Sequence, residues 1–137
     1  MACKPLIYTA NANSASVVAN ANLPLGTIAR RRTPLIDLGG DSIVISDTGS
    51  RYYLVTVSST FTVPVAGVVT LALQQNGSPV VGATASTTVT TPTTEVRSLS
   101  FQAIVRTFNN VGIDTLSVLN SGVAATFSNI AVTVEQL

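Results

Sequence analysis

Apolar and polar residues alternate along residues 53–63, where the odd positions are apolar except for Ser59 and the even positions turn polar after Leu54. Neighbouring side chains of a β-strand point to opposite faces. The alternation therefore predicts a strand with one face on a core. Pro64 ends the strand, because proline lacks the backbone donor that a sheet ladder needs.

A β-hairpin is predicted directly after this strand. The run from Val68 to Gln75 is followed by Asn76-Gly77, and a second run extends from Val80 to Val89. Asn-Gly readily adopts the positive φ angles of a two-residue hairpin turn. The two runs therefore read as paired antiparallel strands.

Other short apolar or alternating runs lie between turn residues along the whole chain. We expect further strands at residues 6–9, 17–19, 25–31, 35–38, 42–46, 95–108, 114–119 and 124–134. No run has the periodicity of an amphipathic helix. Many short strands with regular turn signals predict an all-β antiparallel sandwich or barrel.

The composition is unusually poor in charge. Hydrophobic residues make up 46% of the 137 residues and charged residues only 9%, where about 25% is usual for a soluble domain. This length fits one domain. Two explanations stay open: burial of surface in an oligomer, or a surface kept soluble by uncharged polar side chains. We favour the oligomer, because large exposed apolar patches mark contacts.

Several classes of partner and location are disfavoured. A net charge of +1 argues against nucleic-acid binding. Every apolar run ends well before the roughly 20 residues of a transmembrane helix, so no membrane contact is expected. The start shows no secretory signal, so we expect synthesis in the cytoplasm. Cys3 is the single cysteine, and an unpaired thiol is favoured over a bridge between chains.

Three motifs carry a resemblance to a known family. Residues 49–57, the L-x-L-x-x-N-G-x-x-V-x-G pattern at Leu71 to Gly82, and residues 114–122 resemble tumour-necrosis-factor-like and complement-head-like jelly rolls. The opening at residues 6–13 and the ending at residues 128–135 are similar to bacterial versions. These are the heads of collagen-like exosporium proteins and small stand-alone proteins of phages and prophages of Clostridia.

The resemblance implies an antiparallel β-sandwich jelly roll of about ten strands that assembles as a homotrimer around a threefold axis. Residues 26–137 would form the jelly-roll domain, and residues 1–25 an N-terminal arm or attachment segment. The sequence contains no Gly-X-Y collagen repeat. We therefore expect the stand-alone viral type rather than a spore stalk.

Aromatic residues are common anchors of subunit contacts. Tyr52 and Tyr53 are adjacent in a predicted strand and must point to opposite faces, so at most one enters the core. The other is the candidate for the trimer interface, together with Phe108 or Phe127. A tyrosine on the outer surface is the alternative.

Catalytic and metal chemistry has little support in the sequence. It has no histidine and one cysteine, and its six acidic residues form no pair at a spacing suited to acid–base catalysis. We predict no catalytic residue, no cofactor and no enzyme activity. Asp37, Asp41 and Asp47 surround one turn region, where a calcium site and solvated turn aspartates are the two interpretations. The second is favoured, so no metal is predicted.

Three of the seven basic residues are consecutive, at Arg30, Arg31 and Arg32. On a strand, Arg30 and Arg32 share one face and Arg31 takes the other. One hypothesis is that they hold carboxylates of a neighbouring subunit or of a capsid protein. The alternative is a solvated strand end that pairs with Asp37 or Asp47.

The sequence thus favours a non-enzymatic structural virion protein, a homotrimeric capsid decoration or head or tail appendage of a bacteriophage. Its partners would be itself and phage capsid or tail proteins, and its location the virion. One alternative is a module that recognises glycan or a host surface, although only 5% of residues are aromatic and none is Trp. The other is a structural protein of a spore or cell surface.

Overall fold

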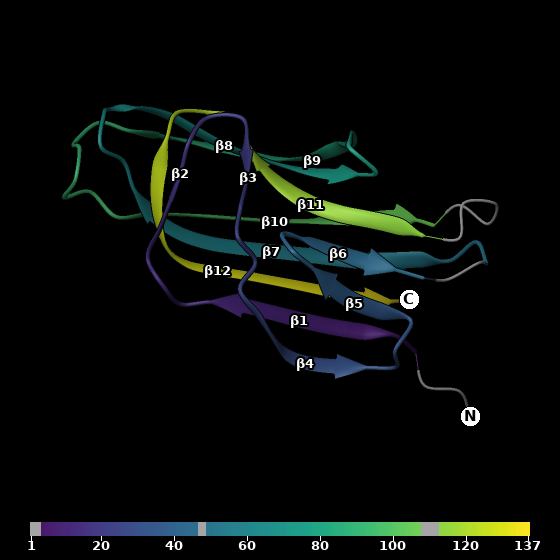
Figure 1. Cartoon of the computed structure of the whole chain (residues 1–137). Helices are drawn as coiled ribbons and strands as arrows, with labels where there is room; N and C mark the ends of the chain where they lie inside the picture. Colours follow the sequence, from purple (N-terminus) through teal and green to yellow (C-terminus); the bar gives the residue numbers. More distant parts are fainter. Residues whose placement is uncertain (1–3, 47–48, 108–112) are drawn as a thin grey trace.

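The computed structural model describes residues 4–46, 49–107 and 113–137, and every regular element within them is a β-strand (Figure 1). The predicted all-β antiparallel sandwich is confirmed. The described residues form twelve strands rather than about ten, because the short strands β2 and β3 add to the long ones. In chain order the strands are β1 (Leu6–Asn11), β2 (Ala15–Val17), β3 (Ala21–Asn22), β4 (Thr27–Arg32), β5 (Ile36–Gly39), β6 (Ser42–Ile45), β7 (Tyr52–Thr62), β8 (Gly67–Gln75), β9 (Ser78–Val89), β10 (Arg97–Arg106), β11 (Asp114–Asn120) and β12 (Ala125–Gln136).

The strands form two sheets. Sheet 1 has the order β10-β7-β12-β1-β4, with β2 paired to β12. Sheet 2 has the order β5-β6-β11-β8-β9, with β3 paired to β11. The first and last strands, β1 and β12, are neighbours in sheet 1. The two ends of the described chain therefore lie side by side in one sheet (Figure 1).

The core lies between the inner faces of the two sheets. All the odd positions of β7, including Val55 and Val57, are buried, which confirms the face predicted from the alternation. Phe61 of β7 packs on Phe127 of β12 with ring centroids 5.3 Å apart and planes tilted by 54°. Such tilted aromatic pairs stabilise a core beyond the area that they bury.

Hydroxyl groups that enter the core are satisfied by backbone carbonyls. The buried Ser59 Oγ donates to the carbonyl of Leu99 at 3.1 Å, and Thr9 Oγ1 donates to the carbonyl of Val132 at 3.4 Å. A buried hydroxyl without a partner would cost free energy. These bonds explain why a polar residue at position 59 does not interrupt the apolar face.

The predicted hairpin is present, and a buried carboxylate fixes it. Asn76 and Gly77 have φ angles of 53° and 82°, and they join Gln75 directly to Ser78 across the β8–β9 ladder. The side-chain amide of Asn76 donates to the Asp114 carboxylate at 2.8 Å. The turn is therefore tied to the first residue of β11 as well as to its own strands.

Residues 4–25, which include most of the expected arm, contribute three strands to the sandwich. β1 lies between β12 and β4 in sheet 1, whereas β2 and β3 pair with β12 and β11. Leu23 and Leu25 are buried. The described part of this segment therefore packs within its own chain, and its role in attachment or exchange stays a prediction.

Burial on the inner face of β7 can be tested with two matched valine substitutions. Val57 is 0% exposed on β7 and Val81 is 100% exposed on β9, so Val→Ala removes the same atoms from opposite environments. We expect Val57→Ala to lower the free energy of unfolding by about 2 kcal/mol. Val81→Ala should change it by less than about 0.5 kcal/mol. Equal losses in chemical denaturation would contradict this core assignment.

Candidate functional site on the outer face of sheet 1

The outer face of sheet 1, on the side away from the core, carries both exposed tyrosines of the described residues. Tyr53 is buried, so its neighbour Tyr52 points outward and is 55% exposed. Tyr8 is 37% exposed on β1, because Ile7 beside it enters the core. Ile104 on β10 is 58% exposed on the same face. Large apolar side chains on one sheet face are typical of a contact surface.

Strand register brings these side chains into a continuous surface. One row crosses the five main strands of sheet 1 through directly opposite residues, in the order Ile104, Leu54, Glu135, Leu6 and Arg32. Directly opposite side chains share a face and lie close enough to contact. We call the surface formed by Leu6, Tyr8, Tyr52, Leu54, Ile104 and Glu135 the tyrosine face.

Shorter side chains lie farther along this outer face. A row farther along the strands consists of Ser100, Ser58, Ala131 and Ala10 in register. Such short side chains extend little above the backbone, so this part of the outer face offers area for contact.

The two predicted interface tyrosines separate as the alternation requires, and Tyr52 is the one that faces outward. Phe127 is instead a fully buried core residue beside Phe61. The reason is a β-bulge between Phe127 and Asn129, which reverses the inward and outward positions of the first part of β12. Phe108 lies outside the described residues.

The arginine triplet alternates as predicted. On β4, Arg30 and Arg32 lie opposite Tyr8 and Leu6 and share their outer face. Arg30 donates to the carbonyl of Ala29 at 2.8 Å, and Arg32 Nε donates to that of Lys4 at 2.7 Å. Neither guanidinium has a carboxylate partner among the described residues.

Arg31 points the other way and closes one edge of the sandwich. Its guanidinium pairs with Asp37 Oδ1 at 2.7 Å, which links β4 of sheet 1 to β5 of sheet 2. Both side chains are exposed, so the pair contributes about 0–1 kcal/mol. Of the two partners predicted for the triplet, Asp37 is thus bound to Arg31, while Asp47 lies outside the described residues.

No metal centre is formed by the part of the chain that the structure describes, since no three His, Cys, Asp or Glu residues gather there. Asp37 accepts hydrogen bonds from Arg31 and from the amide of Leu38. Cys3 is also outside the described ranges. Those ranges contain no helix long and apolar enough to cross a membrane.

A hollow of about 290 Å³ lies at the β8–β9 hairpin. It is lined by Gln75, Asn76, Ser78, Pro79 and Val80. Its amide groups are already used inside the chain: Gln75 Nε2 donates to the carbonyl of Arg106 at 2.7 Å, and Asn76 binds Asp114. Specific ligand sites need polar groups that are available to the ligand. We therefore assign no ligand to this hollow.

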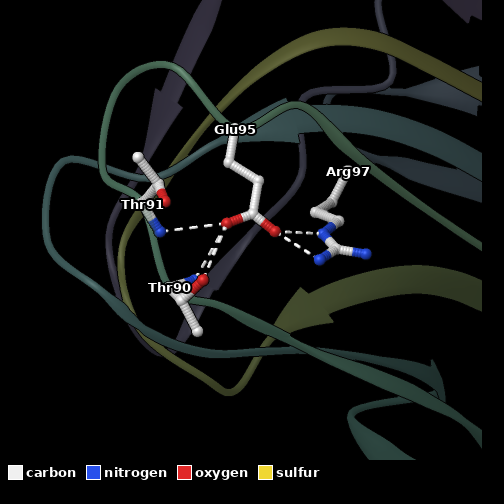
Figure 2. Close-up of polar contacts among 4 residues, drawn as sticks. All are labelled: Thr90, Thr91, Glu95 and Arg97. Atoms are coloured by element: carbon white, nitrogen blue, oxygen red, sulfur yellow. Dashed lines mark hydrogen bonds and ion pairs between the residues drawn. The ribbon is translucent and has the colours of Figure 1, made fainter.

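The loop between β9 and β10 is organised by one carboxylate (Figure 2). Glu95 Oε1 accepts from the amides of Thr91 at 2.9 Å and Thr90 at 3.1 Å, and Oε2 pairs with Arg97. The amide of Thr91 is the main cause that lowers the pKa of Glu95 from 4.5 to about 2, with Arg97 second. The group is therefore a structural anchor that stays ionised at neutral pH.

Titration of Glu95 gives a test of this anchor. A carboxyl group with a lowered pKa in the folded state stabilises the fold above its unfolded pKa, near 4.5, and loses this contribution as pH falls toward about 2. The stability difference between the wild type and Glu95→Gln should therefore shrink between about pH 5 and pH 2. A Glu95 carboxyl signal that titrates near 4.5 in NMR spectra would refute the anchor.

Comparison with known proteins adds information at the level of the fold. No protein-family model matches the sequence, and no curated protein matches it. Eiger TNF from S. frugiperda has a similar structure, with a TM-score of 0.73 and 13% identity over 98% of this chain and 91% of that one. The globular domain of zebrafish complement 1qA gives 0.64 and 15%, over 98% and 97%.

The PRD1 vertex protein P5 is also similar, with a TM-score of 0.63 and 14% identity over 97% of this chain and 96% of that one. At these identities the likeness concerns the fold. The comparisons therefore show a tumour-necrosis-factor-like jelly-roll fold, which this chain shares with a complement head and with a vertex protein.

Proposed function

We propose that this protein is a non-enzymatic structural component of a bacteriophage virion that acts as a homotrimer, either decorating the capsid or forming a head or tail appendage. The observation that carries the proposal is the tyrosine face, an apolar and aromatic surface on a chain with only 9% charged residues. The similar fold of a vertex protein supports the virion location.

Trimerisation gives the tyrosine face a partner. Tyr52 and Ile104 are more than half exposed in the single chain, and Tyr8 lies on the same face. Aromatic and aliphatic side chains that leave water at a subunit contact contribute about 25 cal/mol per Å² of apolar area. Assembly would therefore remove the apolar surface that the low charge content leaves exposed.

Three of the described acidic groups support a structural rather than a catalytic role. Asp37 pairs with Arg31, Glu95 anchors its loop, and Asp114 is buried beneath the hairpin. Each of these three carboxylates is thus engaged in holding two parts of the fold together. The sequence also has no histidine, the residue that most often transfers protons in catalysis.

Arg30 and Arg32 are the proposed contact with the capsid or tail. They lie on β4, at the edge of sheet 1 away from β10, and their charges have no carboxylate partner among the described residues. Guanidinium groups bind carboxylates with two parallel hydrogen bonds. An acidic surface on a capsid or tail protein would supply carboxylates that pair with these two guanidinium groups.

The trimer can be tested by size-exclusion chromatography with light scattering. We expect a mass about three times the 14.1 kDa of the single chain at micromolar concentration. Tyr52→Ala combined with Ile104→Ala should shift the mass toward the monomer, because both side chains leave the contact. Val81→Ala on sheet 2 is the control and should leave the mass unchanged. A monomeric wild type would contradict the proposal.

Docking to the virion can be tested with Arg30→Ala combined with Arg32→Ala. We expect weaker co-sedimentation with capsids of the source virus prepared without this protein, because charge-assisted bonds are lost. Arg31→Ala is the matched control, since it removes a charge that pairs within the chain. Binding of the double variant that equals the wild type at every salt concentration would refute this contact.

A further inference from the structure

Glu135 is an isolated carboxylate within the tyrosine face. It lies on β12, the central strand of sheet 1, directly opposite Leu54 on one side and Leu6 on the other. It is half-buried and makes no hydrogen bond or ion pair with the described residues. Covering such a charge with an apolar partner would be costly unless the partner brought a cation.

Arg106 is a cation on the same outer face that also has no carboxylate partner among the described residues. It lies directly opposite Tyr52 at the end of β10, and its Nε donates to the hydroxyl of Ser50 at 2.6 Å. β10 and β12 are separated by β7, which places them about 10 Å apart across the sheet. The hydroxyl is a neutral partner that an incoming carboxylate can replace or share.

The two edges of sheet 1 differ in a way that selects one for docking. The β4 edge is exposed and carries three arginines, a pattern that discourages contact between sheet edges. The β10 edge carries the apolar Ile104 two residues from Arg106. The β10 edge thus combines an apolar side chain with the cation that Glu135 requires.

We propose that Arg106 of each copy binds Glu135 of the next copy, so that the β10 edge of one chain lies over the centre of its neighbour's tyrosine face. This inference rests on the proposed homotrimer and names the ion pair that sets its register. An edge placed on a face is a head-to-tail contact, which closes into a ring of three when each copy is rotated by one third of a turn from the last, as the proposed homotrimer requires.

Charge balance favours this arrangement over two outer faces stacked around a twofold axis. A stacked pair would bring Arg30, Arg32 and Arg106 of each chain into one contact with a single Glu135 from each chain. Like charges brought together in a contact are unfavourable. The edge-on-face contact matches one cation with one carboxylate and leaves the β4 arginines outside it.

The experiment measures association by light scattering over a concentration series for the wild type and charge-swapped variants. Glu135→Arg and Arg106→Glu alone should each weaken assembly about 30-fold or more, because each puts like charges together. The chain that carries both substitutions should assemble again, since the pair is restored with its signs reversed. Glu135→Arg combined with Arg32→Glu is the matched control and should stay dissociated.

The outcomes separate this ion pair from the proposed trimer. Single variants that assemble as tightly as a trimeric wild type, or a double variant that is not rescued beyond the Arg32 control, would overturn the pair and leave the trimer standing. A monomeric wild type would overturn both. Circular dichroism checks that each chain folds, and Glu135→Gln, also expected to weaken assembly, replaces Glu135→Arg if that variant is misfolded.

Discussion

Packing of two β-sheets through their inner faces is the constraint on which this molecule depends. Each sheet can bury only one face, and that face is filled by the inward positions of β7, β12 and the strands opposite them. The Phe61–Phe127 contact joins two neighbouring strands within this core, and the hydroxyls of Ser59 and Thr9 enter it only with backbone partners. Any further function is therefore left to the outer faces, edges and loops.

Several charged groups of this chain serve the fold at points where the apolar core ends. Glu95 holds the β9–β10 loop, Asp114 holds the hairpin turn, and the Arg31–Asp37 pair links the two sheets at their edge. A chain with few charges that pairs several of them within the chain has few unpaired charges on its surface. This low number of unpaired charges is consistent with a protein whose outer faces are covered by other copies or by a larger assembly.

The outer face of sheet 1 carries charged groups that form no ion pair with the described residues. Tyr52 and Ile104 are exposed on this face, and Glu135 and Arg106 lie near them with opposite charges. In the proposed trimer a second copy would cover the apolar side chains and pair with both charges. Self-assembly would therefore account for the apolar surface and for the unmatched charges by one mechanism.

The strand pattern was determined by the sequence itself because it depends on local chemistry. Alternation identified the buried face of β7, and Asn76-Gly77 identified the hairpin through the backbone angles that these two residues tolerate. The two-residue strand β3 was not predicted. Two residues are too few to show an alternating pattern, and β3 is a strand because it pairs with β11.

Tertiary structure decided the direction and the partners of individual side chains. The bulge in β12 turned Phe127 from its expected outward position into the core, and core packing chose Tyr53 over Tyr52 for burial. The meeting of β4 and β5 gave Arg31 its partner Asp37. Local sequence determines which apolar and polar residues alternate along a strand. Long-range strand pairing determines where a β-bulge interrupts the alternation and which residues each sheet face contacts.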